Sequence, residues 1–257
     1  MTEIDGIDEL VAMLTLFLWP MIRISAFMIT APLFSMDVIN IRIRLMVAVV
    51  LTFFIYDNQT IPTIDPLSAD GLWQIATQVF IGACMGFLLQ IVNAAIVVGG
   101  EAISNAMGLG FASMVDPNLG NVPLISQFMV ILSTFIFLTL GGHLVVIQLL
   151  FQSFDSIPIG SLPPFADWLA IMFGWFPFIF LGAMNLALSM MVSLLLLNIA
   201  LGVMTRSAPA LNIIAVGFPA ILLVGLLALN VNITAMVYAI QRLWTQALAT
   251  LQLFPGV

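Results

Sequence analysis

The amino-acid sequence predicts an all-α integral membrane protein, and three observations support this prediction. Hydrophobic residues make up 63% of the 257 residues, whereas charged residues make up only 7%. The mean hydropathy is +1.23, and the hydrophobic residues gather in long runs. A soluble domain carries about 25% charged residues. Because a chain of this length cannot cover itself in water with so few charges, we expect it to lie in lipid.

Six apolar runs account for most of the chain. A helix needs about 20 apolar residues to cross the hydrocarbon core, so we expect about six long apolar helices or helical hairpins, some of them bent. The runs lie near residues 10–35, 41–56, 72–100, 124–151, 168–203 and 211–241. The second run is short. The fifth would measure about 50 Å as one straight helix, and we expect Pro177 and Gly182 to bend it or its end to project beyond the membrane.

The segments between the runs differ in charge. Acidic residues precede the first run, separate the second from the third, and separate the fourth from the fifth. Arg42 and Arg44 follow the first run, and Arg206 follows the fifth. Arginine marks the cytoplasmic side, so we expect the acidic loops and both termini to face outward, although Arg242 does not fit this scheme. Because the acidic start lacks the positive charge of a secretory signal, we expect the first run to be retained as an anchor.

Several function classes are disfavoured by composition. The net charge of −7 comes from separate acidic loops, which does not predict a nucleic-acid surface. The single cysteine, Cys84, excludes an internal disulfide and a cysteine metal cluster. His143 is the only histidine, whereas a histidine-based metal site needs several ligands, so we expect a hydrogen-bonding residue at a helix end. We therefore expect no enzymatic activity, no metal and no cofactor.

A glycine-rich segment at residues 107–123, MGLGFASMVDPNLGNVP, separates the third and fourth runs. Gly108 and Gly110 permit backbone angles that other residues resist. Residues 116–118, Asp-Pro-Asn, are typical of a turn, and Pro123 keeps a helix from resuming before the fourth run. The segment also lacks the Gly-Lys-Ser/Thr ending of a phosphate-binding loop. The sequence therefore predicts an interruption between two membrane helices.

The composition of this segment fits a plug or constriction. Backbone groups freed by a broken helix must be covered by protein or line a watery cavity. Apolar constrictions can gate by excluding water, and methionine adapts to irregular shapes. A structural loop covered by neighbouring helices is an equally open interpretation. The residues of the candidate plug are Met107, Gly108, Leu109, Gly110, Phe111, Ala112, Ser113, Met114, Val115, Asp116, Pro117, Asn118 and Gly120.

Three charged residues are candidates for buried polar or inter-subunit contacts. Arg23 lies inside the first run, between two prolines, where an arginine costs a few kcal/mol unless it is paired or hydrated. It either extends to an interface with water or pairs with a carboxylate or carbonyl groups. Glu101 ends the third run, and Arg206 follows the fifth. Solvation in a loop is the alternative for both. Broken helices with polar groups also suit a secondary transporter of a small solute, although the chain has no convincing internal repeat.

Three motifs resemble one known family. MGLGFASMVDPNLGNVPLISQF, at residues 107–128, resembles the signature of the flagellar biosynthetic FliR family, which is shared with the R-type subunits of virulence type III secretion systems. RISAFMITAPLFSMDVINIRIRLMVAV, at residues 23–49, resembles the family's region from the first to the second helix. NIALGVMTRSAPALNIIAVGFPAILLVG, at residues 198–225, resembles its C-terminal hairpin. The three occur in the family's order and spacing.

This resemblance implies an inner-membrane subunit of the flagellar basal body's type III protein export gate. P-type and Q-type gate subunits and other membrane proteins of the export apparatus are the implied partners, in a heteromeric helical assembly that passes unfolded substrates. Residues 1–200 would form a P-subunit-like region that includes the plug at 107–123, and residues 201–257 a Q-subunit-like hairpin region. Family members form a cone lifted toward the periplasm, so their hairpins need not span the bilayer as hydropathy suggests.

Overall fold

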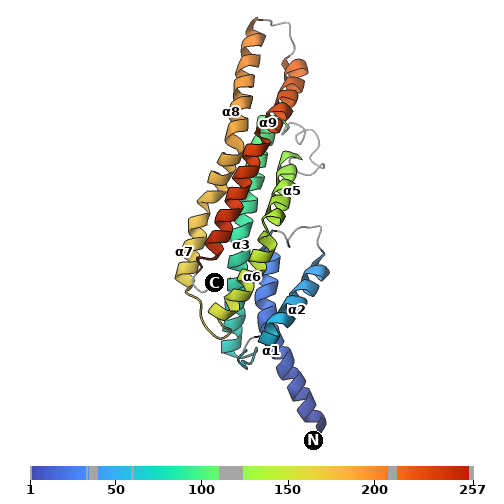
Figure 1. Cartoon of the computed structure of the whole chain (residues 1–257), viewed down its shortest axis with the longest axis vertical. Helices are drawn as coiled ribbons and strands as arrows, with labels where there is room; N and C mark the ends of the chain where they lie inside the picture. The colour runs from blue at the N-terminus through green and yellow to red at the C-terminus, as the bar shows by residue number, and fades with distance from the viewer. Residues whose placement is uncertain are drawn as a thin grey trace. The chain divides into compact units, whose positions relative to one another are not determined.

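A computed structural model describes residues 2–32, 34, 40–58, 61–109, 124–207 and 213–254. Within these residues every regular element is an α-helix (Figure 1). The helices are α1 (Thr2–Thr30), α2 (Ile41–Asn58), α3 (Ala69–Ala106), α5 (Leu124–Thr139), α6 (Gly142–Ser156), α7 (Phe165–Trp175), α8 (Pro177–Ser207) and α9 (Ile213–Leu251). The predicted all-α membrane class is confirmed.

Four segments of the described chain are long and apolar enough to cross a membrane. They are Met13–Thr30, Ala69–Ala106, Phe165–Met204 and Pro219–Leu251. Helices α5 and α6 together make a fifth candidate if the broken pair is one span. Of the six runs, the one on α2 falls short, because Arg42, Arg44 and Asp57 lie within its 18 residues.

Two of the expected runs are broken helices. Within the fifth run, one helix ends at Trp175 and the next begins at Pro177. This break is expected because proline has no N–H to continue the preceding helix. Gly182 does not break α8. The fourth run, which the sequence shows as one apolar run, is interrupted between α5 and α6, where Gly141 has a φ of +67°. That left-handed conformation is readily adopted only by glycine, and it ends the helix.

The described helices divide between two compact units. The first comprises Met1–Ile91, Gly141–Trp175 and Gln246–Val257, and the second comprises Val92–Leu140 and Phe176–Thr245. Helix α3 contributes its beginning to the first unit and its end to the second. These units are defined by packing. The division into P-like residues 1–200 and Q-like residues 201–257 concerns resemblance to other subunits and stays a prediction.

In the first unit, α1 and α3 approach each other through glycine. Gly82 faces the backbone of α1, where an added Cβ would overlap the Arg23 carbonyl oxygen. One turn later, a Cβ on Gly86 would lie 2.8 Å from the backbone nitrogen of Ala31 and would overlap the Thr30 hydroxyl. Small residues four apart on one helix face allow such close backbone approach in membrane proteins. Helix α2 packs on α1 with its side chains Ala48, Thr52 and Ile55 buried.

In the second unit, α8 and α9 lie side by side as a hairpin (Figure 1). Gly182 of α8 belongs to this packing, because a Cβ there would lie 3.1 Å from Leu243 of α9 and 3.0 Å from Ala95 of α3. Trp244 donates a 2.8 Å hydrogen bond from its indole nitrogen to the Ser133 hydroxyl of α5. Its ring packs edge-on against Phe137, with ring centroids 4.5 Å apart. This bond satisfies the one polar group of a fully packed indole.

The close approach at Gly82 predicts that one methyl group added at this position destabilises the fold. Gly82→Ala should lower the Tm of the detergent-solubilised protein by several degrees, because an overpacked contact with backbone costs about 1–3 kcal/mol. Gly174→Ala is the matched control, since Gly174 is also helical and has no atom within 4 Å of an added Cβ. It should leave the Tm unchanged or raise it slightly, as alanine favours helix. Equal melting of the two variants, measured by differential scanning fluorimetry, would contradict this packing.

Candidate functional site

The candidate plug begins at a well-defined helix end. The N–H of Leu109 donates to the carbonyl of Ser104 at 3.1 Å, and the N–H of Gly108 donates to that of Asn105 at 3.0 Å. Gly108 has a φ of +76°. This pair of bonds with a left-handed glycine is the Schellman ending of a helix, which satisfies carbonyls that the helix itself leaves free. Gly108 thus adopts a backbone angle of the kind that the sequence allows it, and α3 ends just before it.

The last residue before this glycine is anchored in the second unit. Met107 is 1% exposed, and its side chain lies over Gly225 of α9. A Cβ at Gly225 would lie 2.6 Å from the Met107 methyl carbon and 3.0 Å from its Cγ. Gly225 thus provides the space that Met107 fills. The two contacts fix the point at which the chain leaves α3.

The remainder of the candidate plug lies outside the described residues. The structure places Met107, Gly108 and Leu109, whereas residues 110–123 are not described. The assignment of a plug to Gly110, Phe111, Met114, Asp116 and their neighbours therefore stays a prediction.

Arg23 lies at the centre of a polar cluster in the first unit. Its side chain is fully buried. Its Nε donates to Gln78 Oε1 at 2.7 Å, its Nη1 to the Ser153 carbonyl at 2.7 Å and hydroxyl at 3.1 Å, and its Nη2 to the Ile157 carbonyl at 2.9 Å. The guanidinium carbon lies 4.1 Å from the centre of the Phe154 ring. Carbonyls and an amide of the same chain thus surround Arg23, which does not extend to an interface with water.

This arrangement closes the end of α6. The Ser153 carbonyl, in the last turn of α6, already accepts the Ile157 N–H at 3.0 Å and takes Arg23 as a second donor. The Ile157 carbonyl follows that turn, where carbonyls have no partner within the helix. An arginine offers five N–H donors in a planar fork, and its positive charge is favourable at the negative end of a helix. Arg23 therefore joins α1, α3 and α6 through its hydrogen bonds to Gln78, Ser153 and Ile157.

The cluster continues along α3 to the protein surface. Gln78 Nε2 donates to Gln74 Oε1 at 3.3 Å, and Gln74 Oε1 also accepts a 3.3 Å bond from the Gly160 backbone N–H. Sequence reasoning missed Gln74, Gln78 and Ser153. Two glutamines four residues apart lie on one helix face, so their spacing was a usable signal, whereas Ser153 is 130 residues from Arg23 and carried none.

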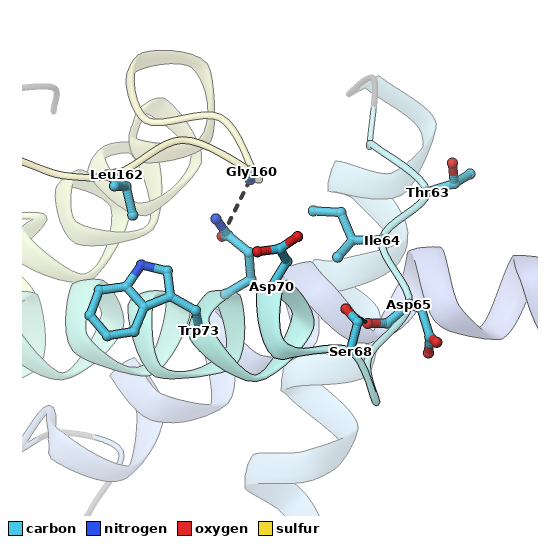
Figure 2. A pocket seen from close by; sticks show the side chains of 9 residues that line it. Thr63, Ile64, Asp65, Ser68, Asp70, Trp73, Gly160 and Leu162 are labelled. Atoms are coloured by element: carbon cyan, nitrogen blue, oxygen red, sulfur yellow. Dashed lines mark hydrogen bonds between the residues drawn. The ribbon is translucent and has the colours of Figure 1, made fainter.

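A polar pocket lies where this chain of hydrogen bonds ends. Its volume is about 510 Å³, within the 300–1,000 Å³ range of typical ligand pockets. Figure 2 shows walls from the segment before α3, from the first turns of α3, and from the segment between α6 and α7. The residues that line it are Thr63, Ile64, Asp65, Ser68, Asp70, Trp73, Gln74, Gly160 and Leu162.

The other candidate residues are placed as follows. Glu101 is half-buried in α3, and Arg206 is exposed in the last turn of α8. Their roles in contacts between subunits stay predictions. His143 lies in the first turn of α6, but its buried Nδ1 has no hydrogen-bond partner among the described residues, so the expected hydrogen bond is not formed there.

Comparison with known proteins places the chain in a family. Residues 14–247 match the family described as bacterial export proteins, family 1. The chain belongs to this family. It is 36% identical over 220 residues to the flagellar biosynthetic protein FliR of Escherichia coli (strain K12), covering 85% of this chain and 84% of the relative. It is 36% identical to FliR of Pectobacterium carotovorum over 223 residues, and 26% identical to FliR of Bacillus subtilis (strain 168) over 249 residues, which is 95% of this chain and 96% of that protein.

The resemblance to the FliR family, inferred from the three motifs, is therefore confirmed. This export protein is a membrane protein of the flagellar export apparatus, as its family and its apolar helices indicate. Membership in this family does not favour the alternative of a small-solute transporter.

The hydrogen bonds of the Arg23 cluster predict that a positive charge alone does not stabilise the fold at this position. In Arg23→Lys, one ammonium group cannot reach Gln78, Ser153 and Ile157 together, and each buried acceptor left without a donor costs about 1–3 kcal/mol. We expect this variant to be nearly as unstable as Arg23→Met. Arg242→Lys, at an exposed position in α9, should behave like the parent. Size-exclusion chromatography after heating measures the surviving fraction, and survival of Arg23→Lys at the parent level would be inconsistent with the cluster.

Proposed function

We propose that this chain is an inner-membrane subunit of the flagellar type III export gate and that residues 107–123 form a plug in its channel. The observation that carries this proposal is the ending of α3. Gly108 turns the chain out of an apolar helix, and Met107 anchors that turn on Gly225. A segment that leaves such a helix inside the hydrocarbon region must be covered by protein or line a watery space.

The side chains of the segment suit closure of a channel. In the proposed closed state, Leu109, Phe111, Met114 and Val115 meet in the lumen and exclude water and ions, as apolar constrictions do. An unfolded export substrate displaces them. The backbone freedom of glycine lets the segment change conformation, while the anchored Met107 keeps its start in place. The protein needs no catalytic group for this role, and we propose no enzymatic activity.

The proposed gate is heteromeric. P-type and Q-type subunits would pack beside this chain, with residues 1–200 corresponding to the P type and 201–257 to the Q type. The second unit offers an apolar surface for such packing, because α8 exposes Leu188, Leu195 and Ile199. Glu101 and Arg206 are the proposed polar contacts between subunits. Arg23, which is bonded within its own unit, is proposed to hold the shape of this subunit.

Removal of the plug should open the closed gate to ions. In gates assembled with their P-type and Q-type partners and reconstituted in liposomes, deletion of residues 110–122 should raise passive ion flux by at least tenfold. Serine at Leu109, Phe111, Met114 and Val115 together should have a smaller effect in the same direction, since polar side chains admit water to the constriction. Ion-sensitive dye trapped in the liposomes gives the flux.

A matched variant separates the plug from general damage. Serine at Leu67 and Leu162, which are 89% and 59% exposed and lie outside the segment, should leave the flux at the parent level. If gates with the deletion stay as ion-tight as the parent while containing all their subunits, the plug assignment is wrong. Co-purification of the chain with P-type and Q-type proteins is the independent requirement of the gate itself, because a transporter would purify alone or with copies of itself.

A further inference from the structure

In the polar pocket of the first unit, the buried Arg23 determines the orientation of one hydrogen-bond donor. Arg23 can only donate, so the Gln78 amide must turn its oxygen to Arg23 and its nitrogen to Gln74. Gln74 in turn uses its oxygen for Gln78 and the Gly160 N–H. Its amide nitrogen is thereby left for the pocket, where it has no acceptor among the described residues. Gln74 is only 5% exposed, so this donor is fixed in place.

Two carboxylates stand at the same pocket. Asp65 is exposed and uses one oxygen to accept the Leu67 N–H at 3.0 Å, and Asp70 is exposed in the first turn of α3. Arg23 is buried and bonded. Arg42 and Arg44 lie in the first turn of α2, whereas the pocket segment follows its last turn.

An aromatic side chain completes the chemistry of the pocket. Trp73 lines it and is 56% exposed, and Figure 2 shows its ring on the α3 side of the pocket, below Leu162. Tryptophan is the best aromatic partner of a cation. The pocket thus combines negative charge, an aromatic ring and one fixed N–H donor.

We propose that this pocket binds a basic segment of a neighbouring protein. A lysine or arginine side chain of that segment pairs with Asp65 and Asp70 against the Trp73 ring, and a main-chain carbonyl of the same segment accepts from the Gln74 amide. A bound metal ion does not explain the site, since the Gln74 nitrogen is a donor and cannot be a metal ligand. Among the described residues no three His, Cys, Asp or Glu side chains are grouped to hold a metal. The binding site goes beyond the proposed plug and does not depend on it.

Fluorine NMR of the full-length protein in detergent tests this binding directly. The chain has five tryptophans, so labelling with 5-fluorotryptophan gives five signals, and Trp73→Phe identifies the one from Trp73. Titration with the peptide acetyl-Gly-Arg-Gly-amide should shift the Trp73 signal in a saturable manner and leave the other four in place. The same peptide with citrulline, which is neutral and similar in shape, should bind at least tenfold more weakly.

Charge variants give the matched controls. The double variant Asp65→Asn and Asp70→Asn should abolish the shift, whereas Asp167→Asn, at an exposed aspartate of α7 outside the pocket, should retain it. The proposal is overturned if the arginine and citrulline peptides shift the signal equally, if neither shifts it, or if Mg²⁺ alone reproduces the shift at the same sites. None of these results bears on ion flux through the gate, so the plug and the pocket stand or fall separately.

Discussion

Backbone groups at helix ends must form hydrogen bonds even in an apolar interior, and this structure depends on that constraint. A bilayer offers no water to a free N–H or carbonyl group, and α3 and α6 both end beside buried apolar side chains, Met107 and Phe154. At the end of α3, Gly108 takes a left-handed conformation and the backbone bonds to itself. At the end of α6, Arg23 supplies donors from another helix. Two different chemical solutions therefore meet one requirement.

The solution at α6 has the wider consequences. A buried charge is costly unless hydrogen bonds and favourable charge surround it, and Arg23 obtains both from the carbonyl end of α6, from Gln78 and from the Phe154 ring. The close packing of Gly82 against the Arg23 carbonyl keeps α1 at the distance that these bonds need. The orientation of the glutamines then follows, and it extends the influence of Arg23 to a surface pocket.

Much of the fold was predictable because its signals are local. Hydrophobic runs predicted the helices, and Pro177 predicted the break between α7 and α8. The break at Gly141 was not predicted, because a glycine inside a helical pattern is tolerated and nothing nearby in the sequence requires a left-handed residue. The partners of Arg23 lie 55 to 134 residues away. A single sequence indicates that such an arginine needs partners, but it does not indicate which residues the fold brings to it.

The central claim is that the segment begun by Gly108 lies in the passage used by exported polypeptides. Site-specific photo-crosslinking tests it most directly, in assembled gates that hold an export substrate stalled by a folded domain at its trailing end. A photoreactive residue at Phe111 should form a crosslink to the stalled substrate, whereas one at Met46, which is 67% exposed on α2, should form none. Crosslinks from Phe111 only to lipid or detergent, with substrate present in the gate, would contradict the account.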